Sequence, residues 1–248
     1  EEIPLEIIPN LNDRISLIND IKALLIILRL LRLYKPSIVH AHSSKAGILA
    51  RIACYLLNIN TVIYHVHGWS FSREKGIIKK FYIFLEKLFY IITTKYIFVC
   101  EQDMKDFILF GCNPNIKTKS ILVYPASEFL ELEKQNYYRT KLRNELGFND
   151  SDIVFGTIAR IDYQKNPLIF TEIANNYSKL DQDSKFLWIG KGPLEKNMKM
   201  QIQKFGLTDK FTLTGYIENV EPYFSVFDIF LITSKYEGLP VTALKALA

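Results

Sequence analysis

The sequence predicts an α/β protein made of two domains in series, each built on a parallel sheet. Short apolar runs rich in Val and Ile alternate with longer amphipathic segments along the chain. Strands that are separated by helices join through right-handed crossovers and form parallel sheets. A polar stretch interrupts the alternation, which then starts again. We therefore expect a first domain over residues 1–124, a linker over residues 125–151 and a second domain over residues 152–248.

Candidate strands in the first half are short and rich in β-branched residues, and segments of helical period separate them. The expected strands cover residues 5–9, 37–42, 61–67, 96–100 and 120–124. The expected helices cover residues 15–34, 45–57, 76–94 and 102–110. Ser43 and Ser44 precede the second of these helices and can cap it. Pro36 and Pro114 follow the ends of two helices, because proline cannot continue a helix.

The second half repeats the alternation after a polar helix over residues 137–146 of the linker. The expected strands cover residues 153–159, 185–189, 211–215 and 229–234. The expected helices cover residues 167–180, 194–205, 220–225 and 241–248. The run 229–234 leaves no room for a polar face, which is typical of a strand buried on both faces of a parallel sheet. Pro240 stands in the first turn of the last helix, where proline is tolerated.

Composition excludes a disordered chain and limits the other classes of protein. Hydrophobic residues make up 49% of the chain and charged residues 23%, which is enough apolar surface for substantial cores. No apolar run reaches the roughly 18 residues that a membrane helix needs. The three cysteines show no metal-ligand spacing, so reduced thiols of a cytosolic protein are the simplest interpretation. The chain begins at Glu1 and stops within a helical pattern, so we expect both domains to be incomplete.

Positive charge is concentrated in the first half of the chain. The net charge is +5, yet residues 14–95 carry 13 Lys and Arg side chains against three acidic ones. This distribution indicates an anionic partner, such as a phospholipid surface, a polyprenyl phosphate or a nucleic acid. The helix over residues 76–94 mixes lysines with many aromatic residues. It either packs in a core with a solvated lysine edge or rests on an anionic bilayer.

All the histidines fall in two His-x-His pairs near the carboxyl ends of expected strands. His40 and His42 form the first pair, and His65 and His67 form the second. In a strand, residues i and i+2 point to one face. We expect at least one of these rings to bind substrate or act in catalysis, with His67 favoured because Gly68 follows it. The alternatives are rings that only satisfy backbone groups, or a zinc chelate. Because no cluster of Cys or Asp supports a chelate, we expect no metal.

Cations and a carboxylate stand at strand ends in the second half. Arg160 and Lys165 follow the strand that opens this half, and two cations beside a helix amino terminus can hold a diphosphate. The turn over residues 190–192 is rich in glycine and could let a base or ribose lie against the backbone. Glu237 lies between a strand and a helix, at the sheet edge where ligands of α/β proteins bind.

Taken together, five stretches of the chain resemble the GT-B glycosyltransferases of family four, the group 1 glycosyltransferases. They are IVHAHSSKAG at 38–47, VIYHVHGWSF at 62–71, GTIARIDYQK at 156–165, IGKGPLE at 189–195 and EGLP at 237–240. The first two are most similar to the bacterial subgroup that builds capsule, O-antigen and glycan precursors on polyprenyl diphosphate. The resemblance implies two Rossmann-like domains with parallel sheets facing a cleft, an acceptor-side domain first and a nucleotide-sugar domain second.

The resemblance also implies roles for individual residues. The implied catalytic residues are His67 and Glu237. The implied donor-binding residues are Gly68, Arg160, Lys165, Ile217, Glu237, Gly238, Leu239 and Pro240. The implied acceptor side consists of His42, Ser43, Ser44 and Lys45. Arg160 and Lys165 would hold the donor diphosphate, Glu237 the donor sugar, and the backbone at Ile217 the base.

The implied reaction is metal-independent sugar transfer with retention of configuration, from a UDP-linked donor to a polyprenyl-diphosphate-linked sugar or glycan. The implied partners include an anionic membrane surface and no nucleic acid. The implied location is cytoplasmic and peripheral, on the inner face of the cell membrane. One departure stands out, because the family places a ribose-binding glutamate where this chain has Lys245. The alternative is therefore a non-catalytic or impaired relative that binds sugar nucleotides.

Overall fold

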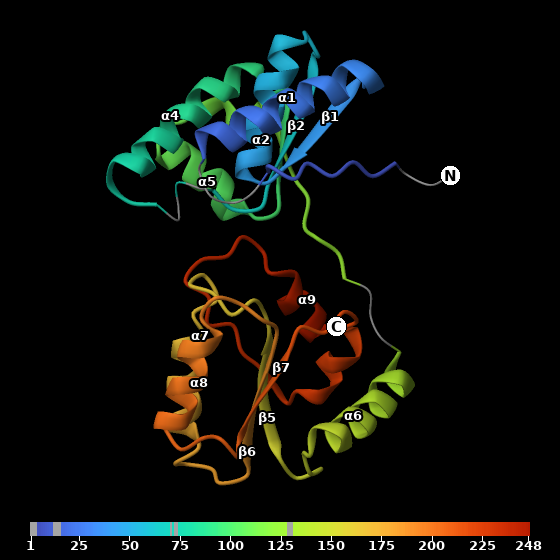
Figure 1. Ribbon diagram of the computed structural model, residues 1–248, viewed down its shortest axis with the longest axis vertical. Helices are drawn as coiled ribbons and strands as arrows, with labels where there is room; N and C mark the ends of the chain where they lie inside the picture. Colours follow the sequence, from blue (N-terminus) through green and yellow to red (C-terminus); the bar gives the residue numbers. More distant parts are fainter. Residues whose placement is uncertain (1–3, 12–15, 70, 72–73, 128–130) are drawn as a thin grey trace. The chain divides into compact units, whose positions relative to one another are not determined.

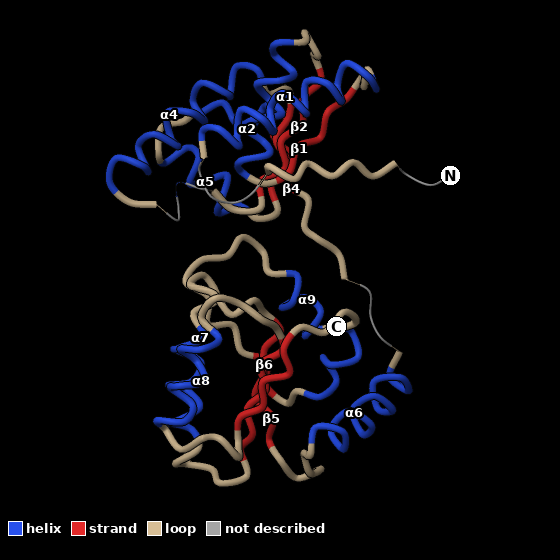
Figure 2. Tube along the Cα trace, viewed as in Figure 1, coloured by secondary structure: helices blue, strands red, loops and turns tan. Residues whose placement is uncertain are grey.

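The computed structural model describes residues 4–11, 16–69, 71, 74–127 and 131–248. The chain forms two compact units, Glu1–Pro125 and Ala126–Ala248, and each contains a four-stranded parallel sheet with helices packed against it (Figures 1 and 2). The predicted α/β class is therefore confirmed. Among the described residues, no helix has both the length and the apolar character needed to cross a membrane.

The first unit has strands in the spatial order β1-β2-β3-β4, so each strand pairs with the next one along the chain. The strands are β1 Ile38–His42, β2 Thr61–Val66, β3 Lys95–Phe98 and β4 Ser120–Leu122. The helical segments are α1 Leu17–Tyr34, α2 Ser44–Leu56, α4 Gly76–Ile92, α5 Glu101–Leu109 and the 3-10 helix η1 Pro114–Lys119. These bounds lie within a few residues of the expected ones, and residue 15 of the first expected helix lies outside the described residues.

Two local expectations in this unit are wrong. Residues 5–9 were expected to form a strand but adopt no regular structure, and Leu5 and Ile7 are 86% and 78% exposed. An apolar pentapeptide becomes a strand only where a neighbouring strand pairs with it, and none does here among the described residues. The second helix begins at Ser44, so Ser43 occupies the N-cap position, but its side chain makes no capping hydrogen bond with any described residue.

The core of the first unit lies on one face of its sheet. Tyr64 and Val66 of β2 and Phe98 of β3 are fully buried there, against α2, α4 and α5. Trp69 follows β2, stacks on Phe107 and donates its indole N–H to the backbone oxygen of Asp103, 2.6 Å away. Since side chains alternate along a strand, this packing directs the histidines of β1 and β2 to the opposite face.

A buried ion pair joins α2 to α4 on the core side of this sheet. Arg51 is 0% exposed and donates to both carboxylate oxygens of Glu86, over 2.8 and 2.9 Å. Its Nε–H donates to the backbone oxygen of Gly47, 3.0 Å away. The guanidinium lies between two rings, 4.1 Å from the centroid of Tyr64 and 4.7 Å from that of Phe89. Each of its donor groups therefore has a partner, which a buried charge requires.

The second unit has strands in the order β7-β6-β5-β8. The strands are β5 Ile153–Ile158, β6 Ser184–Ile189, β7 Phe211–Gly215 and β8 Ile229–Phe230. The helical segments are α6 Leu132–Leu146, α7 Pro167–Tyr177, α8 Glu195–Lys204, the 3-10 helix η2 Glu221–Val226 and α9 Val241–Leu247. Helices α7 and α8 cover one face of the sheet, and α6 with η2 covers the other (Figure 1).

The helix of the expected linker packs within the second unit. Helix α6 starts at Leu132 and lies against η2, although the two are far apart in sequence. Its Arg143 is buried and donates to Asp228, with Nη1 3.1 Å from Oδ2. The same Oδ2 accepts the backbone N–H of Val154 over 2.7 Å, at the start of β5. One carboxylate thus joins α6, the first strand of the sheet and the segment before β8. Residues 128–130 of the expected linker lie outside the described residues.

Strand β8 is shorter and more exposed than the sequence predicts. Residues 229–234 were expected to form a strand buried on both faces, but only Ile229 and Phe230 pair, with Phe155 and Gly156 of β5. Ile232 is 44% exposed. Among the described residues, β8 has a neighbouring strand on one side only. No described strand on its other side supplies the hydrogen bonds that would lengthen it. Residues 231–234 therefore form the start of the loop that carries Glu237.

Candidate functional site

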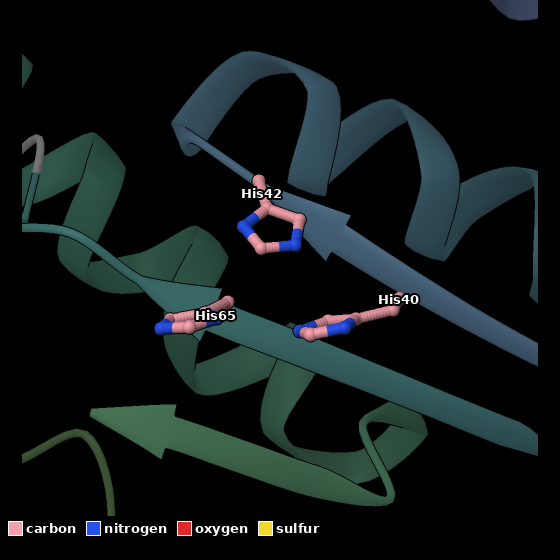
Figure 3. Close-up of side chains that lie close together, drawn as sticks. All are labelled: His40, His42 and His65. Atoms are coloured by element: carbon pink, nitrogen blue, oxygen red, sulfur yellow. The ribbon is translucent and has the colours of Figure 1, made fainter. Parts of the chain in front are cut away.

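The four histidines of the first unit gather on the sheet face opposite the core. Strands β1 and β2 are parallel, and their register places His42 directly opposite His65. His40 lies two residues before His42 on the same face, and His67 follows the end of β2. Figure 3 shows the rings of His40, His42 and His65 side by side, from two neighbouring strands. The structure therefore joins the two predicted pairs into one group.

The rings contact one another closely. The ring centroids of His65 and His67 are 4.4 Å apart, and Nδ1 of His42 lies 3.0 Å from Nε2 of His67, where one ring donates an N–H to the other. Burial and the neighbouring imidazoles lower the pKa of His65 to about 4. The same two causes, burial first, lower the pKa values of His42 and His67. These three rings are therefore neutral at pH 7.

The other predicted residues of the first unit surround the carboxyl ends of β1 and β2. Gly68 has a φ of 113°, which side chains disfavour, and apart from its two chain neighbours no atom of the described residues lies within 4 Å of where a Cβ would be. Ser43 and Ser44 connect β1 to α2. Lys45 forms an ion pair with Asp20 of α1, with Nζ 2.8 Å from Oδ1. This lysine thus follows His42 closely in sequence and already forms an ion pair with a carboxylate.

In the second unit, the predicted cation and carboxylate meet. Nζ of Lys165 lies 2.5 Å from Oε1 of Glu237, and both side chains are mostly buried. Lys165 comes from the loop between β5 and α7, and Glu237 comes from the loop between β8 and α9. Both line a small pocket with Thr157, Trp188 and Thr233. Two predicted donor-binding residues that are distant in sequence therefore share one site at the carboxyl end of β5.

Hydrogen bonds hold these two loops together. Thr233 donates its hydroxyl hydrogen to the backbone oxygen of Lys165 over 2.9 Å, and the backbone N–H of Lys235 donates to the backbone oxygen of Gln164 over 2.8 Å. The side-chain amide of Gln164 donates to the backbone oxygen of Tyr236 over 3.2 Å. Sequence reasoning did not identify Gln164 as a positioning residue, and the only signal was its place beside Lys165.

Arg160 lies on the same loop and remains exposed. Its Nε donates to Oδ2 of Asp162 over 2.5 Å, while Oδ1 of Asp162 accepts the backbone N–H of Lys165 over 3.0 Å. One carboxylate thus orients both predicted diphosphate ligands. Sequence reasoning missed Asp162, although its position between two cations is the kind of pattern that marks an orienting group.

The glycine-rich turn after β6 serves packing. A Cβ on Gly190 would lie 2.1 Å from the backbone oxygen of Ala159, and one on Gly192 would lie 2.2 Å from that of Ile161. The glycines therefore allow the backbone of this turn to approach the loop that carries Arg160. A contact of the turn with a base or ribose stays a prediction.

Of the remaining predicted residues of this unit, Pro240 lines the pocket. Ile217 is half-buried and packs against the core beside α6. Gly238 and Leu239 form the turn before α9, and Pro240 lines the pocket and precedes the first residue of that helix. Their donor-binding roles stay predictions.

Lys245, on α9, pairs with Glu221 at the start of η2. The hydrogen bond from Lys245 is the main cause that lowers the pKa of Glu221. The position where the family resemblance places a second glutamate thus has an ionised carboxylate beside it, supplied by another segment of the chain.

The sequence is similar to glycosyltransferases that include two from Escherichia coli. A relative from Escherichia coli, named UDP-Gal:alpha-D-GlcNAc-diphosphoundecaprenol alpha-1,3-galactosyltransferase, is 33% identical over 96% of this chain and 62% of its own length. The O-antigen biosynthesis glycosyltransferase WbnH from Escherichia coli is 26% identical over 83% of this chain and 54% of its own length. The chain therefore spans about six tenths of the length of these curated relatives.

Solved structures and family descriptions agree with this similarity. The crystal structure of HepE from Anabaena in complex with UDP and glucose matches 95% of this chain and 63% of its own chain, with a TM-score of 0.75 and 15% identity. Residues 4–118 match the family described as glycosyl transferase 4-like domain, and residues 138–248 match the glycosyl transferases group 1. Because the two matches follow one another over most of the sequence, the chain belongs to the group 1 glycosyltransferases, with a 4-like domain followed by a group 1 domain.

Proposed function

We propose that the protein transfers a sugar, with retention of configuration, from a UDP-linked donor to a polyprenyl-diphosphate-linked sugar or glycan during synthesis of a bacterial surface polysaccharide. The observation that carries this proposal is the Lys165–Glu237 pair, held at the carboxyl end of β5 with Arg160 on the same loop. A cation for the leaving diphosphate and a carboxylate for sugar hydroxyls are the two groups that the reaction needs there.

The donor is assigned to the second unit. Arg160 and Lys165 bind its diphosphate, and Glu237 accepts hydrogen bonds from hydroxyls of its sugar. The backbone N–H groups after Glu237 support the phosphate or the sugar, and the backbone at Ile217 binds the base. In the first unit, His67 and the Gly68 backbone contact the sugar near the reacting carbon. The acceptor is assigned to His42, Ser43, Ser44 and Lys45.

The chemistry requires no resident cofactor or metal ion. The acceptor hydroxyl attacks the anomeric carbon from the face that the diphosphate leaves, and its proton passes to a donor phosphate oxygen. The bond between the anomeric carbon and that diphosphate breaks, and UDP departs with the bonding electrons. Arg160 and Lys165 stabilise the charge that develops on UDP, more strongly in the transition state than in the bound donor.

The expected result of a transfer assay is the appearance of a lengthened lipid-linked sugar. The full-length protein is incubated with UDP-hexoses and undecaprenyl-diphosphate-linked N-acetylglucosamine, in the presence of EDTA, and the linkage is read by NMR. An α linkage formed from an α-linked donor supports retention. If no UDP-sugar is transferred and Glu237→Ala behaves in the same way as the wild type, the proposal is wrong.

A non-catalytic relative that binds sugar nucleotides is the second candidate, because Lys245 cannot accept hydrogen bonds from a ribose. The ionised carboxylate of Glu221 beside Lys245 supports the catalytic candidate, since it can accept those hydrogen bonds in place of the expected glutamate. Calorimetry of UDP binding, run beside the transfer assay, separates the two. Binding without transfer of any sugar favours the non-catalytic relative.

We also propose that the first unit rests on an anionic membrane surface through α4. An exposed apolar stripe follows the helical repeat along this helix: Ile77, Phe81, Phe84, Leu88 and Ile91. Lys80 and Lys87 are exposed at one edge of the stripe. An apolar face bordered by lysines fits the interface of an anionic bilayer, where the reducing end of a polyprenyl-linked acceptor is anchored.

Vesicle sedimentation tests this location. The wild type is expected to bind anionic phosphatidylglycerol vesicles and to dissociate in high salt, because salt screens the lysines. Each lysine near such a surface contributes about 1 kcal/mol, so Lys80→Gln/Lys87→Gln should weaken binding by about 30-fold. The matched control is Lys105→Gln/Lys117→Gln, which removes two exposed lysines of the same unit outside α4. Equal losses in the two double variants would contradict docking through α4.

A further inference from the structure

The histidine group has a property that the proposed transfer reaction does not use. His40, His42 and His65 each present a ring nitrogen within 4.8 Å of the ring nitrogens of the other two. Among the described residues, no other group of His, Cys, Asp or Glu side chains brings three possible metal ligands so close together. Imidazole nitrogen is a preferred ligand of zinc and related transition-metal ions.

We propose that His40, His42 and His65 form a binding site for one divalent transition-metal ion of the zinc type. The three ligands come from neighbouring parallel strands, with His42 and His65 in direct register. They point to the sheet face opposite the hydrophobic core (Figure 3). Three imidazoles on one side of a metal leave its fourth position open to water or to an anionic oxygen, as in zinc sites that do chemistry.

The state of His65 is an independent observation that indicates a ligand. Both of its ring nitrogens are buried, and neither has a hydrogen-bond partner among the described residues. A buried polar atom without a partner is costly and is rare in folded proteins, unless a water or an ion occupies the adjacent space. A metal ion bound to one of these nitrogens removes that cost for that nitrogen.

The geometry is close to that of a bound tetrahedral ion. Nitrogen ligands about 2.0 Å from zinc lie about 3.3 Å from one another. The present separations are no greater than 4.8 Å. The ring torsion of histidine has a broad energy minimum, so small ring rotations can close this difference without moving the strands. The rings of His40 and His65 are already parallel within 2°, with centroids 5.4 Å apart.

His67 completes the arrangement as a positioning residue. Its Nε2 lies 3.0 Å from Nδ1 of His42, so when Nδ1–H of His42 donates to it, Nε2 of His42 is the free ligand atom. Metal-bound histidines usually donate their second ring N–H to a carboxylate, a backbone carbonyl or a water, which fixes the ring and its tautomer, and Nε2 of His67 would take that place here. This role does not depend on the proposed transfer reaction, which draws its charge stabilisation from Arg160 and Lys165.

Zinc titration of the full chain tests the site. Purified protein is stripped with EDTA, dialysed and titrated with Zn²⁺ without any donor, in competition with a chromophoric chelator. One equivalent is expected to bind, and Co²⁺ is expected to give the visible absorption of four-coordinate cobalt. His40→Gln and His65→Gln should each weaken Zn²⁺ binding by more than about 100-fold, and His67→Gln by about tenfold, since it removes only the orienting partner.

Cys100→Ser is the matched control, because thiols also bind zinc and Cys100 is the free cysteine that is not fully buried. This variant should bind Zn²⁺ as the wild type does. Circular dichroism checks that each histidine variant is folded. If His65→Gln unfolds, His40→Gln still tests the site, because His40 is exposed and its replacement should not affect folding. Absence of stoichiometric Zn²⁺ binding, or unchanged affinity in folded His40→Gln, overturns the proposal. A failed transfer assay leaves this result unaffected.

Discussion

Replacing Lys165 by alanine is expected to lower kcat/KM for sugar transfer by about 10²- to 10³-fold. Removal of one group that stabilises charge in a transition state typically costs this much. In this protein the loss has a second cause, because Glu237 would keep its charge without the ammonium 2.5 Å away. An unpaired carboxylate beside the donor diphosphate adds repulsion. We therefore expect both weaker UDP binding and slower turnover.

Lys235→Ala provides the matched control for this prediction. Lys235 lies on the loop that carries Glu237, is exposed and has its ammonium 3.5 Å from the ring centroid of Tyr163. Its removal changes the net charge of the same region by the same amount and should leave transfer near the wild-type rate. The double variant Lys165→Ala/Glu237→Ala should recover part of the UDP affinity, because it removes the unpaired carboxylate. Equal activity in Lys165→Ala and Lys235→Ala would show that Lys165 has no role in transfer.

The largest effect on stability is expected for Arg51→Ala. This change should lower the free energy of unfolding of the first unit by about 3–5 kcal/mol, because it leaves the buried carboxylate of Glu86 without its charged partner. Lost contacts of the guanidinium with Tyr64 and Phe89 add to the cost. Replacing both partners, as in Arg51→Met/Glu86→Leu, should restore most of the stability, since well-packed apolar side chains substitute well for a buried pair.

Fluorescence can follow the first unit alone, because the chain has two tryptophans and each unit contains one. In a Trp188→Phe background, urea unfolding is reported by Trp69, which is buried beside Phe107. Lys105→Ala is the control, because its ion pair with Glu101 is exposed and should contribute less than about 1 kcal/mol. A cost below about 1 kcal/mol for Arg51→Ala would mean that Glu86 finds another partner or becomes protonated.

The sequence predicted most elements because their signals are local. The period of the apolar residues and the positions of proline placed the strands and helices within a few residues in both units. These local signals failed where strand formation depends on pairing with a strand that is distant in sequence. Residues 5–9 have the composition of a strand but no described strand pairs with them, and residues 231–234 leave the sheet because β8 lies at its edge. Apolar composition alone does not supply a hydrogen-bonding neighbour.

The sequence predicted which residues belong to the candidate site, and the structure shows which of them contact one another. Glu237 and Lys165 were each expected to bind the donor, but their ion pair depends on how β8 docks beside β5, which no local pattern encodes. The two histidine pairs were recognised separately, and only the register between β1 and β2 joins them. At Gly190 the sequence indicated a turn that could contact a ligand, and only the structure shows how closely Ala159 approaches that glycine.

The strand order also sets the sequence in which a growing chain acquires these groups on the ribosome. In the first sheet each strand docks beside the one translated just before it, so the histidine rings can meet as soon as β2 has emerged. The Lys165–Glu237 pair has to wait much longer, because β8 is translated after the three other described strands of its sheet and docks beside β5, the first of the four. A nascent chain that is released before residue 237 therefore lacks the carboxylate, and unfinished translation products should be inert toward sugar nucleotides.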